Sequence, residues 1–402
     1  MKLQSVQMLR GIAALLVLLY HTVSIENLAL TENPSNVDAE PLMAGIWMNG
    51  YAGVDLFFVI SGFIMVYVTS AGRGAGASIA EFLFARITRI YPVWWLFAAV
   101  MAAYFFITLG GPTRFHAPEN EAVVSTGWHL TASFLLLPQP THPVLGVGWT
   151  LVHEMHFYVV FAVLLLLPRR WLPLGLLAWG GAVIAGALTG YAEALAGTMS
   201  QLFFSPLSLE FILGAFAGLA VSRQLTPGIL PWLALALGLI AFVTALALHP
   251  TPTKFTLIWG RVLVFGPPCA LILYGVTSLE ARGDFKTPGV LSSVGDWSYA
   301  LYLSHFLTIG AVRRFFPVVG NHLEAWGLPP ELADLLRPGT AGIWDNVLLN
   351  LACVTAALLV SWVTYRLFER PLIGFFNGWR RSLFRENEDR FRPAPVYATA
   401  AP

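Results

Sequence analysis

Charged residues are scarce in this chain. Only 11% of its 402 residues are Asp, Glu, Lys or Arg, against about 25% in ordinary soluble domains. Hydrophobic residues make up 57%, and the mean hydropathy is +0.69. This composition excludes an ordinary water-soluble globular protein. The net charge is only +1, so nothing in the composition predicts a nucleic-acid partner.

Cysteine is also scarce, and several sequence signatures are missing. The two cysteines, Cys269 and Cys353, both fall inside apolar runs, so we expect no disulfide framework. No small-x-small cleavage site follows His21, which favours an uncleaved first membrane span over a signal peptide. We find no internal repeat, and no Gly-x-Ser-x-Gly elbow that would indicate a serine nucleophile.

Long apolar runs make up most of the sequence. Each of ten runs is long enough to cross a bilayer: residues 8–25, 51–70, 84–109, 149–167, 171–190, 203–221, 229–248, 257–278, 291–312 and 343–368. The run 130–137 is too short to span and predicts an interfacial or re-entrant helix. We therefore predict an all-α polytopic membrane protein with about ten transmembrane helices. Residues 1–373 form the membrane domain in this prediction, and residues 374–402 form a disordered cytoplasmic tail.

Basic residues predict the orientation of the spans. With ten spans, six of the 23 Lys and Arg residues fall on the side opposite the N-terminus, which leaves 17 on the N-terminal side; the six are Arg114, Lys254, Arg261, Arg313, Arg314 and Arg337. Cytoplasmic loops carry the excess of Lys and Arg. The first outer loop has only acidic charges, at Glu26, Glu32, Asp38 and Glu40. Both termini are therefore predicted to be cytoplasmic.

The first apolar run carries two ionisable side chains, Arg10 and His21. Eleven helical residues amount to three turns plus about 20°, so both side chains face the same way, about 16 Å apart along the axis. His21 would then lie near the bilayer midplane, where an ionisable group indicates a functional site by default. An interfacial arginine and a hydrogen-bonded core histidine are the alternative interpretation.

A second basic cluster opens the third run. Arg86 and Arg89 are three residues apart and share a helix face near the cytoplasmic surface. Paired guanidinium groups suit a polyanionic ligand, because each offers a planar fork of donors to phosphate. Arg10 begins its helix on the same side and would complete the cluster. Simple positive-inside retention of the helix is the alternative.

Three ionisable residues begin the fourth run, directly after Trp149. His153 and His156 are close enough to share a metal, but the His-Glu-x-His spacing is not the His-Glu-x-x-His of zinc hydrolases. With no third ligand nearby, we expect no metal site. We interpret Glu154 as an interior polar group that orients a histidine or holds a substrate hydroxyl.

Two further polar residues lie inside apolar runs. Asp55 opens the second run as a candidate buried carboxylate, with Gly53, Ser61 and Gly62 allowing close helix approach. His305 lies inside the run 291–312, where packing is the favoured interpretation of the stretch around it.

Taken together, these stretches resemble the integral-membrane acyltransferase-3 family over about residues 4–373, with the opening and Trp149-Thr150-Leu151 most like its exopolysaccharide-production branch. The resemblance rests on an ordered set of motifs: Arg10 with ten residues before His21, Gly53-Val54-Asp55 with Phe57–Phe63, Arg86-x-x-Arg89 before Tyr91-Pro92, Trp149-Thr150-Leu151 with Glu154 and Phe157-Tyr158, Ser298–His305, and Glu369-Arg370-Pro371.

The resemblance implies ten core spans in a bacterial inner membrane. It also implies an acyl-CoA donor, usually acetyl-CoA, taken from the cytoplasm, with no permanently bound cofactor, and an acceptor hydroxyl on an envelope glycan or glycolipid. In this family the first-span histidine is catalytic and the arginines bind the donor. Those roles carry over to His21, and to Arg10, Arg86 and Arg89. The resemblance assigns no role to His153 and His156.

These residues predict O-acyl transfer. His21 would deprotonate the acceptor hydroxyl, or would first take the acyl group itself. A histidine acts as a general base only in its neutral form, and either Glu154 or Asp55 would orient His21. Asp55, Trp149 and His305 are assigned to substrate binding or support. The alternative is a transporter or flippase of a glycan precursor, although the paired repeats typical of many transporters are not visible. A non-catalytic scaffold in a polysaccharide synthesis complex also fits.

Overall fold

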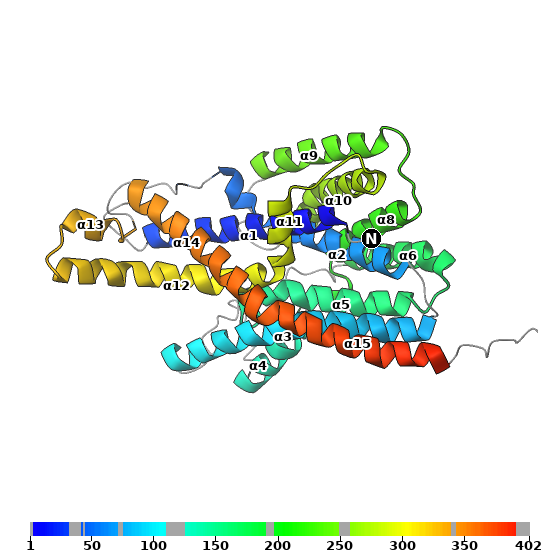
Figure 1. Ribbon diagram of the computed structural model, residues 1–402, viewed down its shortest axis with the longest axis horizontal. Helices are drawn as coiled ribbons and strands as arrows, with labels where there is room; N and C mark the ends of the chain where they lie inside the picture. Colours follow the sequence, from blue (N-terminus) through cyan, green and yellow to red (C-terminus); the bar gives the residue numbers. More distant parts are fainter. Residues whose placement is uncertain are drawn as a thin grey trace, which may run out of the picture.

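In the computed structural model, the described part of the chain is built of helices and turns (Figure 1). Structure is described for residues 3–31, 42, 45–70, 75–109, 125–189, 197–248, 258–338 and 343–390. The all-α prediction is confirmed for these residues. Glu32, Asp38 and Glu40 of the predicted outer loop lie outside them.

Within these ranges, nine helical segments are long and apolar enough to cross a membrane, so the protein is polytopic. They comprise α1 (Gln4–Thr31), α2 (Ala52–Ser70), α3 (Ala75–Leu109), α5 (Trp149–Leu164), α6 (Leu172–Leu188), α7 (Met199–Phe203) with α8 (Ser208–Ser222), α9 (Leu230–Leu248), α10 (Ile258–Arg282), and α14 (Ile343–Thr364), which continues through a π-turn into α15 (Arg370–Arg390). The helices run roughly parallel or antiparallel along the long axis (Figure 1).

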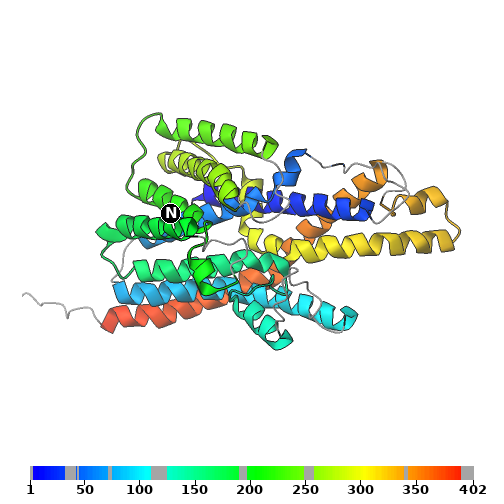
Figure 2. The same ribbon diagram turned by 180° about the vertical axis from the view of Figure 1, so that it is seen from behind.

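The predicted span at 291–312 is not a single apolar helix. The chain breaks at Trp297, between α11 (Gly289–Asp296) and α12 (Ser298–Ala325). Polar side chains, including His305 and the Arg313-Arg314 pair, make α12 less apolar than the nine segments. Figure 2 shows α12 lying along α1 and extending past the bundle toward α13 (Pro330–Asp334). α12 is nevertheless a central wall of the site described below.

Glycines bring the helices around α2 into backbone contact. A side-chain carbon at Gly53 would collide with the carbonyl oxygen of Ala13 on α1, and one at Gly62 with that of Phe211 on α8. On the facing helix, Gly214 meets the carbonyl of Val59 in the same way. The expectation that Gly53 and Gly62 allow close approach is confirmed, and α2 is held between α1 and α8.

Two helices differ from their predicted extents. α3 begins at Ala75 and contains Pro92, so the arginines that the sequence placed at a helix start lie well inside it. The short helix predicted at 130–137 is α4 (Thr126–Leu135). The Ser125 side chain caps it by accepting a hydrogen bond from the backbone N–H of Trp128, as expected of serine at this position.

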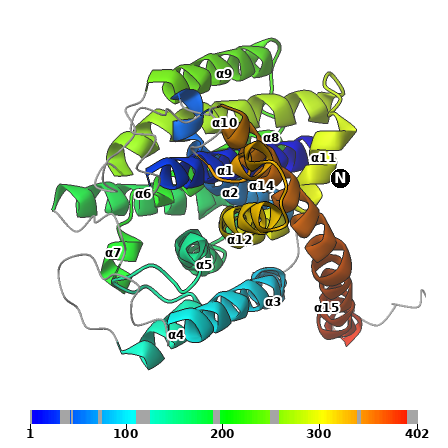
Figure 3. The same cartoon turned by 90° about the vertical axis from the view of Figure 1, so that its left-hand side faces the viewer.

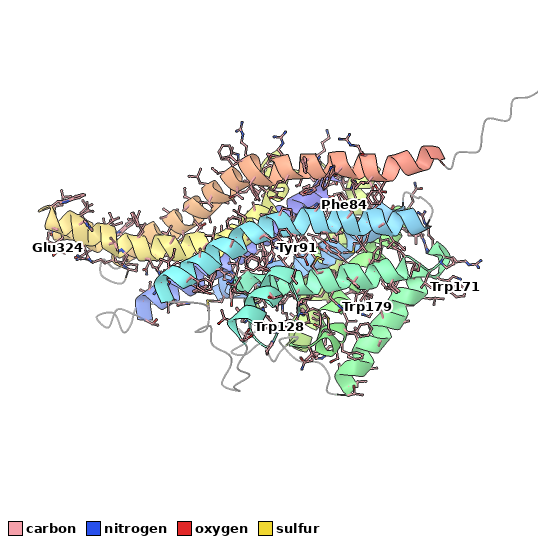
Figure 4. All side chains as sticks on the ribbon, turned by 90° about the horizontal axis from the view of Figure 1, so that it is seen from below. Phe84, Tyr91, Trp128, Trp171, Trp179 and Glu324 are labelled. Carbon is pink, nitrogen blue, oxygen red and sulfur yellow. The ribbon has the colours of Figure 1, made fainter. Side chains whose placement is uncertain are left out.

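Part of the predicted disordered tail is helical. α15 continues to Arg390 and lies alongside α3, with Phe84 on the side that faces it (Figure 4). The Phe84 and Phe384 rings are 5.9 Å apart, and Arg380 lies 3.7 Å from Glu81. These contacts give residues 374–384 a packed surface, which the polar composition did not indicate. Residues 391–402 lie outside the described part.

The orientation of the bundle is open to a direct test. α1 begins and α15 ends toward the same end of the molecule (Figure 1). From the excess of basic residues, we expect a reporter fused after Pro402 to be active in the cytoplasm. A reporter inserted after Thr31, where α1 ends, should be active on the opposite side. The reverse pattern would contradict the predicted orientation.

Candidate active site

A cavity lies among α1, α2, α3, α5 and α12, and the empty space in and in front of it, including space open to solvent, is about 720 Å³. In the end view of Figure 3, α12 lies among α1, α3 and α5. The polar groups lining the cavity come from Arg10, Ser61, Arg86, Arg89, Thr150, Glu154, Tyr158, Tyr299 and Tyr302. The structure thus brings together the three arginines and the glutamate that the sequence singled out, which lie on three different helices.

Arg10 is buried in the cavity wall, with 8% of its surface exposed. Its side chain makes one long hydrogen bond, 3.5 Å from Nη1 to Oε1 of Gln7. The carboxylates of Glu154 and Glu369 and the guanidinium of Arg89 interact with it electrostatically. A buried guanidinium with few protein acceptors is available for an anionic ligand.

Arg86 and Arg89 both line the cavity from α3. The Arg86 guanidinium lies over the rings of Phe82 and Tyr158, 5.5 and 5.6 Å from their centroids. Its Nε is buried without a hydrogen-bond partner among the described residues. Around the cavity, three guanidinium groups face the two carboxylates of Glu154 and Glu369, which leaves an excess of positive charge.

Two neighbouring hydroxyl groups hydrogen-bond to Glu154. Its Oε1 accepts hydrogen bonds from Ser61 Oγ, at 3.1 Å, and from the hydroxyl of Tyr158. The expectation that Glu154 or Asp55 would orient His21 is wrong, because the structure pairs both carboxylates with other groups. Glu154 remains a polar group of the cavity itself.

His21 instead contacts His305. The Nδ1 of His21 lies 3.3 Å from the Nε2 of His305 and 2.9 Å from the carbonyl oxygen of Val17. The ring centroids of the two histidines are 4.9 Å apart, and Phe306 packs edge-on to His21. The histidines are not among the described residues lining the cavity.

Two aromatic side chains connect the cavity to this pair. Tyr302 lines the cavity and also lies 5.9 Å, ring to ring, from His305. Its hydroxyl contacts Thr150 Oγ1 at 2.8 Å and donates to the carbonyl of Val147 at 3.1 Å. Phe57, another lining residue, packs edge-on to Tyr302. Tyr299, Tyr302 and His305 recur every three residues along α12, so one helix connects the arginines to the histidines.

Asp55 and Trp149 belong to a different buried cluster. Both oxygens of the fully buried Asp55 accept hydrogen bonds from Arg261 of α10, at 2.8–2.9 Å. Arg261 also lies over the rings of Tyr51 and Trp149. Arg261, which the sequence placed among the charges on the side opposite the N-terminus, lies near the start of α10 and is 8% exposed, so it is buried among the helices. A lone arginine within an apolar run was the signal for this site.

Sequence reasoning also missed cavity residues. Tyr158, Tyr299 and Tyr302 line it, although the stretch around His305 was interpreted as packing. Glu369, near Arg10 and Arg89, is 2% exposed and has an unpartnered Oε2 among the described residues. The Glu369-Arg370-Pro371 motif was the feature of the sequence that could have indicated this residue.

Comparison with known proteins shows the family to which this chain belongs. The acyltransferase domain family matches residues 3–366. The exopolysaccharide production protein ExoZ of Rhizobium meliloti (strain 1021) is 34% identical, covering 81% of this chain and 90% of the relative. Acyltransferase MdmB of Streptomyces mycarofaciens is 27% identical, covering 77% and 79%.

A protein of Staphylococcus aureus (strain COL) named "Putative O-acetyltransferase SACOL0978" is 24% identical, covering 67% of this chain and 48% of the relative. No solved structure matches this chain. The family match covers nearly the whole of the membrane-embedded chain, including every arginine of the cavity and both histidines. The protein is therefore an acyltransferase and belongs to the acyltransferase-3 family.

Proposed function

We propose that this protein moves an acyl group, in the simplest case acetyl, from acyl-CoA to a hydroxyl of an envelope glycan or exopolysaccharide precursor. One observation carries the proposal. A cavity lined by three arginines is connected through Tyr302 to the contacting pair of His21 and His305, of which His305 is buried. Coenzyme A has the matching chemistry, with phosphates at one end and a thioester at the end of a long arm.

The arginines bind the phosphates of the donor in this proposal. Arg86 and Arg89 each present a planar fork of donors, which fits phosphate oxygens, and Arg10 faces them from α1. With both termini cytoplasmic, these side chains lie toward the cytoplasm, where acyl-CoA is available. The thioester then extends past Phe57 and Tyr302 toward the histidines.

His21 acts as the general base. Its Nε2 takes the proton of the acceptor hydroxyl while the oxygen attacks the thioester carbonyl, so that a C–O bond forms and the C–S bond breaks. The proton then passes from His21 to the departing thiolate of coenzyme A. The products are the ester and free coenzyme A, and the histidine returns to its starting form. Glu154 holds a polar group of the substrates in the cavity.

The names of two relatives support the proposed acceptor. ExoZ is named for exopolysaccharide production, and SACOL0978 for O-acetyl transfer, so a sugar hydroxyl of a glycan or glycolipid is the acceptor we propose. The protein would act in the inner membrane of a bacterium, alone or within a polysaccharide synthesis complex. Residues 1–373 are the proposed catalytic domain. A transporter or flippase is disfavoured, because the chain belongs to an acyltransferase family.

The donor site is tested by conservative substitution of the arginines. We expect Arg86→Lys and Arg89→Lys to weaken binding of acetyl-CoA, because lysine lacks the planar fork. Loss of a hydrogen bond to a charged group corresponds to about 1.5–3 kcal/mol, or about 10- to 150-fold in Kd. Binding is measured with purified protein in lipid nanodiscs.

Arg170→Lys is the matched control, because Arg170 is exposed, lies over Trp171 and does not line the cavity. It should bind the donor as the unmodified protein does. Unchanged affinity in both Arg86→Lys and Arg89→Lys would remove the arginines from the donor site. Absence of acetyl-CoA consumption with glycan acceptors would contradict the proposed reaction.

A further inference from the structure

We propose that His305 is a positioning residue for acyl transfer. It accepts a hydrogen bond from Nδ1–H of His21, which leaves Nε2 of His21 free to take a proton. The sequence alone indicated packing for this residue. The inference rests on the proposed function, because it assigns His305 a role toward the base of that reaction.

The direction of the hydrogen bonds follows from the backbone. The Nδ1 of His305 lies 3.1 Å from the carbonyl oxygen of Leu301, and a carbonyl can only accept. Nδ1 of His305 therefore carries a hydrogen. A neutral imidazole carries one N–H, so Nε2 of His305 has a free lone pair. This lone pair faces His21 at 3.3 Å.

The same argument fixes the tautomer of His21. Its Nδ1 lies 2.9 Å from the carbonyl oxygen of Val17, so Nδ1 of His21 also carries a hydrogen. That hydrogen is shared between two acceptors, the Val17 carbonyl and Nε2 of His305. Nε2 of His21 is then the unprotonated nitrogen, as a general base requires.

His305 becomes more important once the base is charged. When Nε2 of His21 takes a proton, the ring becomes an imidazolium. Its Nδ1–H bond to His305 is then charge-assisted and stronger than the neutral bond. A second group that orients the base and stabilises its charged form is a general feature of nucleophile activation. Here a neutral imidazole fills that place, and Glu154 and Asp55 are engaged elsewhere.

A packing role makes a different prediction. His305 is 1% exposed and lies against Tyr302, so an aromatic ring of similar size would preserve packing. His305→Phe keeps the ring and removes the acceptor, whereas His305→Gln offers an amide oxygen near the position of Nε2. If His305 positions His21, glutamine should preserve more activity than phenylalanine. If it only packs, the order should be reversed.

The kinetic test uses purified protein with acetyl-CoA and a glycan acceptor. We expect His305→Phe to lower kcat by about 10- to 100-fold, as loss of an orienting partner does in comparable sites, with the KM for acetyl-CoA unchanged. His305→Gln should recover part of the loss. Adding His305→Phe to His21→Gln should cause no further loss, because residues that act as a unit are not additive.

A spectroscopic test does not depend on turnover. In protein labelled with ¹⁵N-histidine and reconstituted in lipid, we expect a ¹⁵N–¹⁵N coupling across the hydrogen bond between Nδ1 of His21 and Nε2 of His305. The coupling should disappear in His305→Gln, which identifies its origin. Absence of the coupling in the unmodified protein would overturn the inference.

The two tests separate this inference from the proposed function. If His21→Gln is inactive but His305→Phe keeps full kcat, the role of His305 is overturned and the proposed function stands. If no acyl transfer from acetyl-CoA is found while the coupling is present, the proposed function is wrong although the hydrogen bond exists.

Discussion

His21→Gln is expected to abolish nearly all acyl transfer. Glutamine can replace a hydrogen bond, but its amide cannot accept the proton of the acceptor hydroxyl, and loss of a general base costs about 10²–10⁴ in rate. Donor binding should persist, because His21 does not line the cavity that holds the arginines. Acyl transfer and acetyl-CoA affinity are measured on the same purified preparation.

The chain offers a matched control for this substitution. Nδ1 of His322, near the far end of α12, lies 2.8 Å from the carbonyl of Val318, four residues earlier, as Nδ1 of His21 does with Val17. His322 is exposed and far along α12 from His305, so His322→Gln should leave acyl transfer unchanged. Activity near the unmodified level in His21→Gln would defeat the assignment of the base.

The second large effect is expected on stability, at the buried pair of Asp55 and Arg261. Asp55→Ala removes the carboxylate that hydrogen-bonds the buried Arg261 guanidinium and leaves only the buried Glu210 carboxyl near it; breaking a buried pair in this way costs about 3–5 kcal/mol in comparable proteins. The free energy of unfolding in detergent should fall by this amount. Replacing both partners, as in Asp55→Leu with Arg261→Met, should cost less than the single change, because neither member of the pair is left buried without the other.

Asp284 provides the comparison for this experiment. It pairs with Arg282 at 2.9 Å, but both side chains are about one-third exposed. Water and salt weaken such a pair, so Asp284→Ala should change the unfolding free energy by less than about 1 kcal/mol. Equal losses in Asp55→Ala and Asp284→Ala would show that burial does not set the strength of the Asp55 pair.

Apolar runs predicted most of the helices, because a bilayer demands long, internally hydrogen-bonded segments. The predicted span at 291–312 differs from the structure, because this stretch carries polar residues that face the interior of the protein. The 291–312 run is divided at Trp297, and α12 carries residues that the cavity and the histidine pair use. Hydropathy indicates how favourably a helix contacts lipid. The first half of α12 packs largely against other helices, so its polar residues are not exposed to lipid.

The candidate site was predicted in part. Arg86 and Arg89 were expected on one face, and both line the cavity, because spacing along one helix determines which side chains are neighbours. The partner of His21 was not predicted. Residues 21 and 305 meet only when α1 and α12 adopt particular rotations about their axes, and a single sequence does not specify those rotations. The pairing of Asp55 with Arg261 was missed for the same reason.

The backbone contacts of α2 constrain how substrates reach His21. Because the backbones of α2 and α8 touch at Gly62 and Gly214, sliding or turning one of these helices against the other would bring backbone atoms into collision. Tyr302 is restrained by its two hydrogen bonds, whereas the half-buried ring of Phe57 turns about its own side-chain bonds. If substrates reach His21 from the cavity, we expect the rearrangement to involve Phe57 and α12 rather than a separation of α2 from α8.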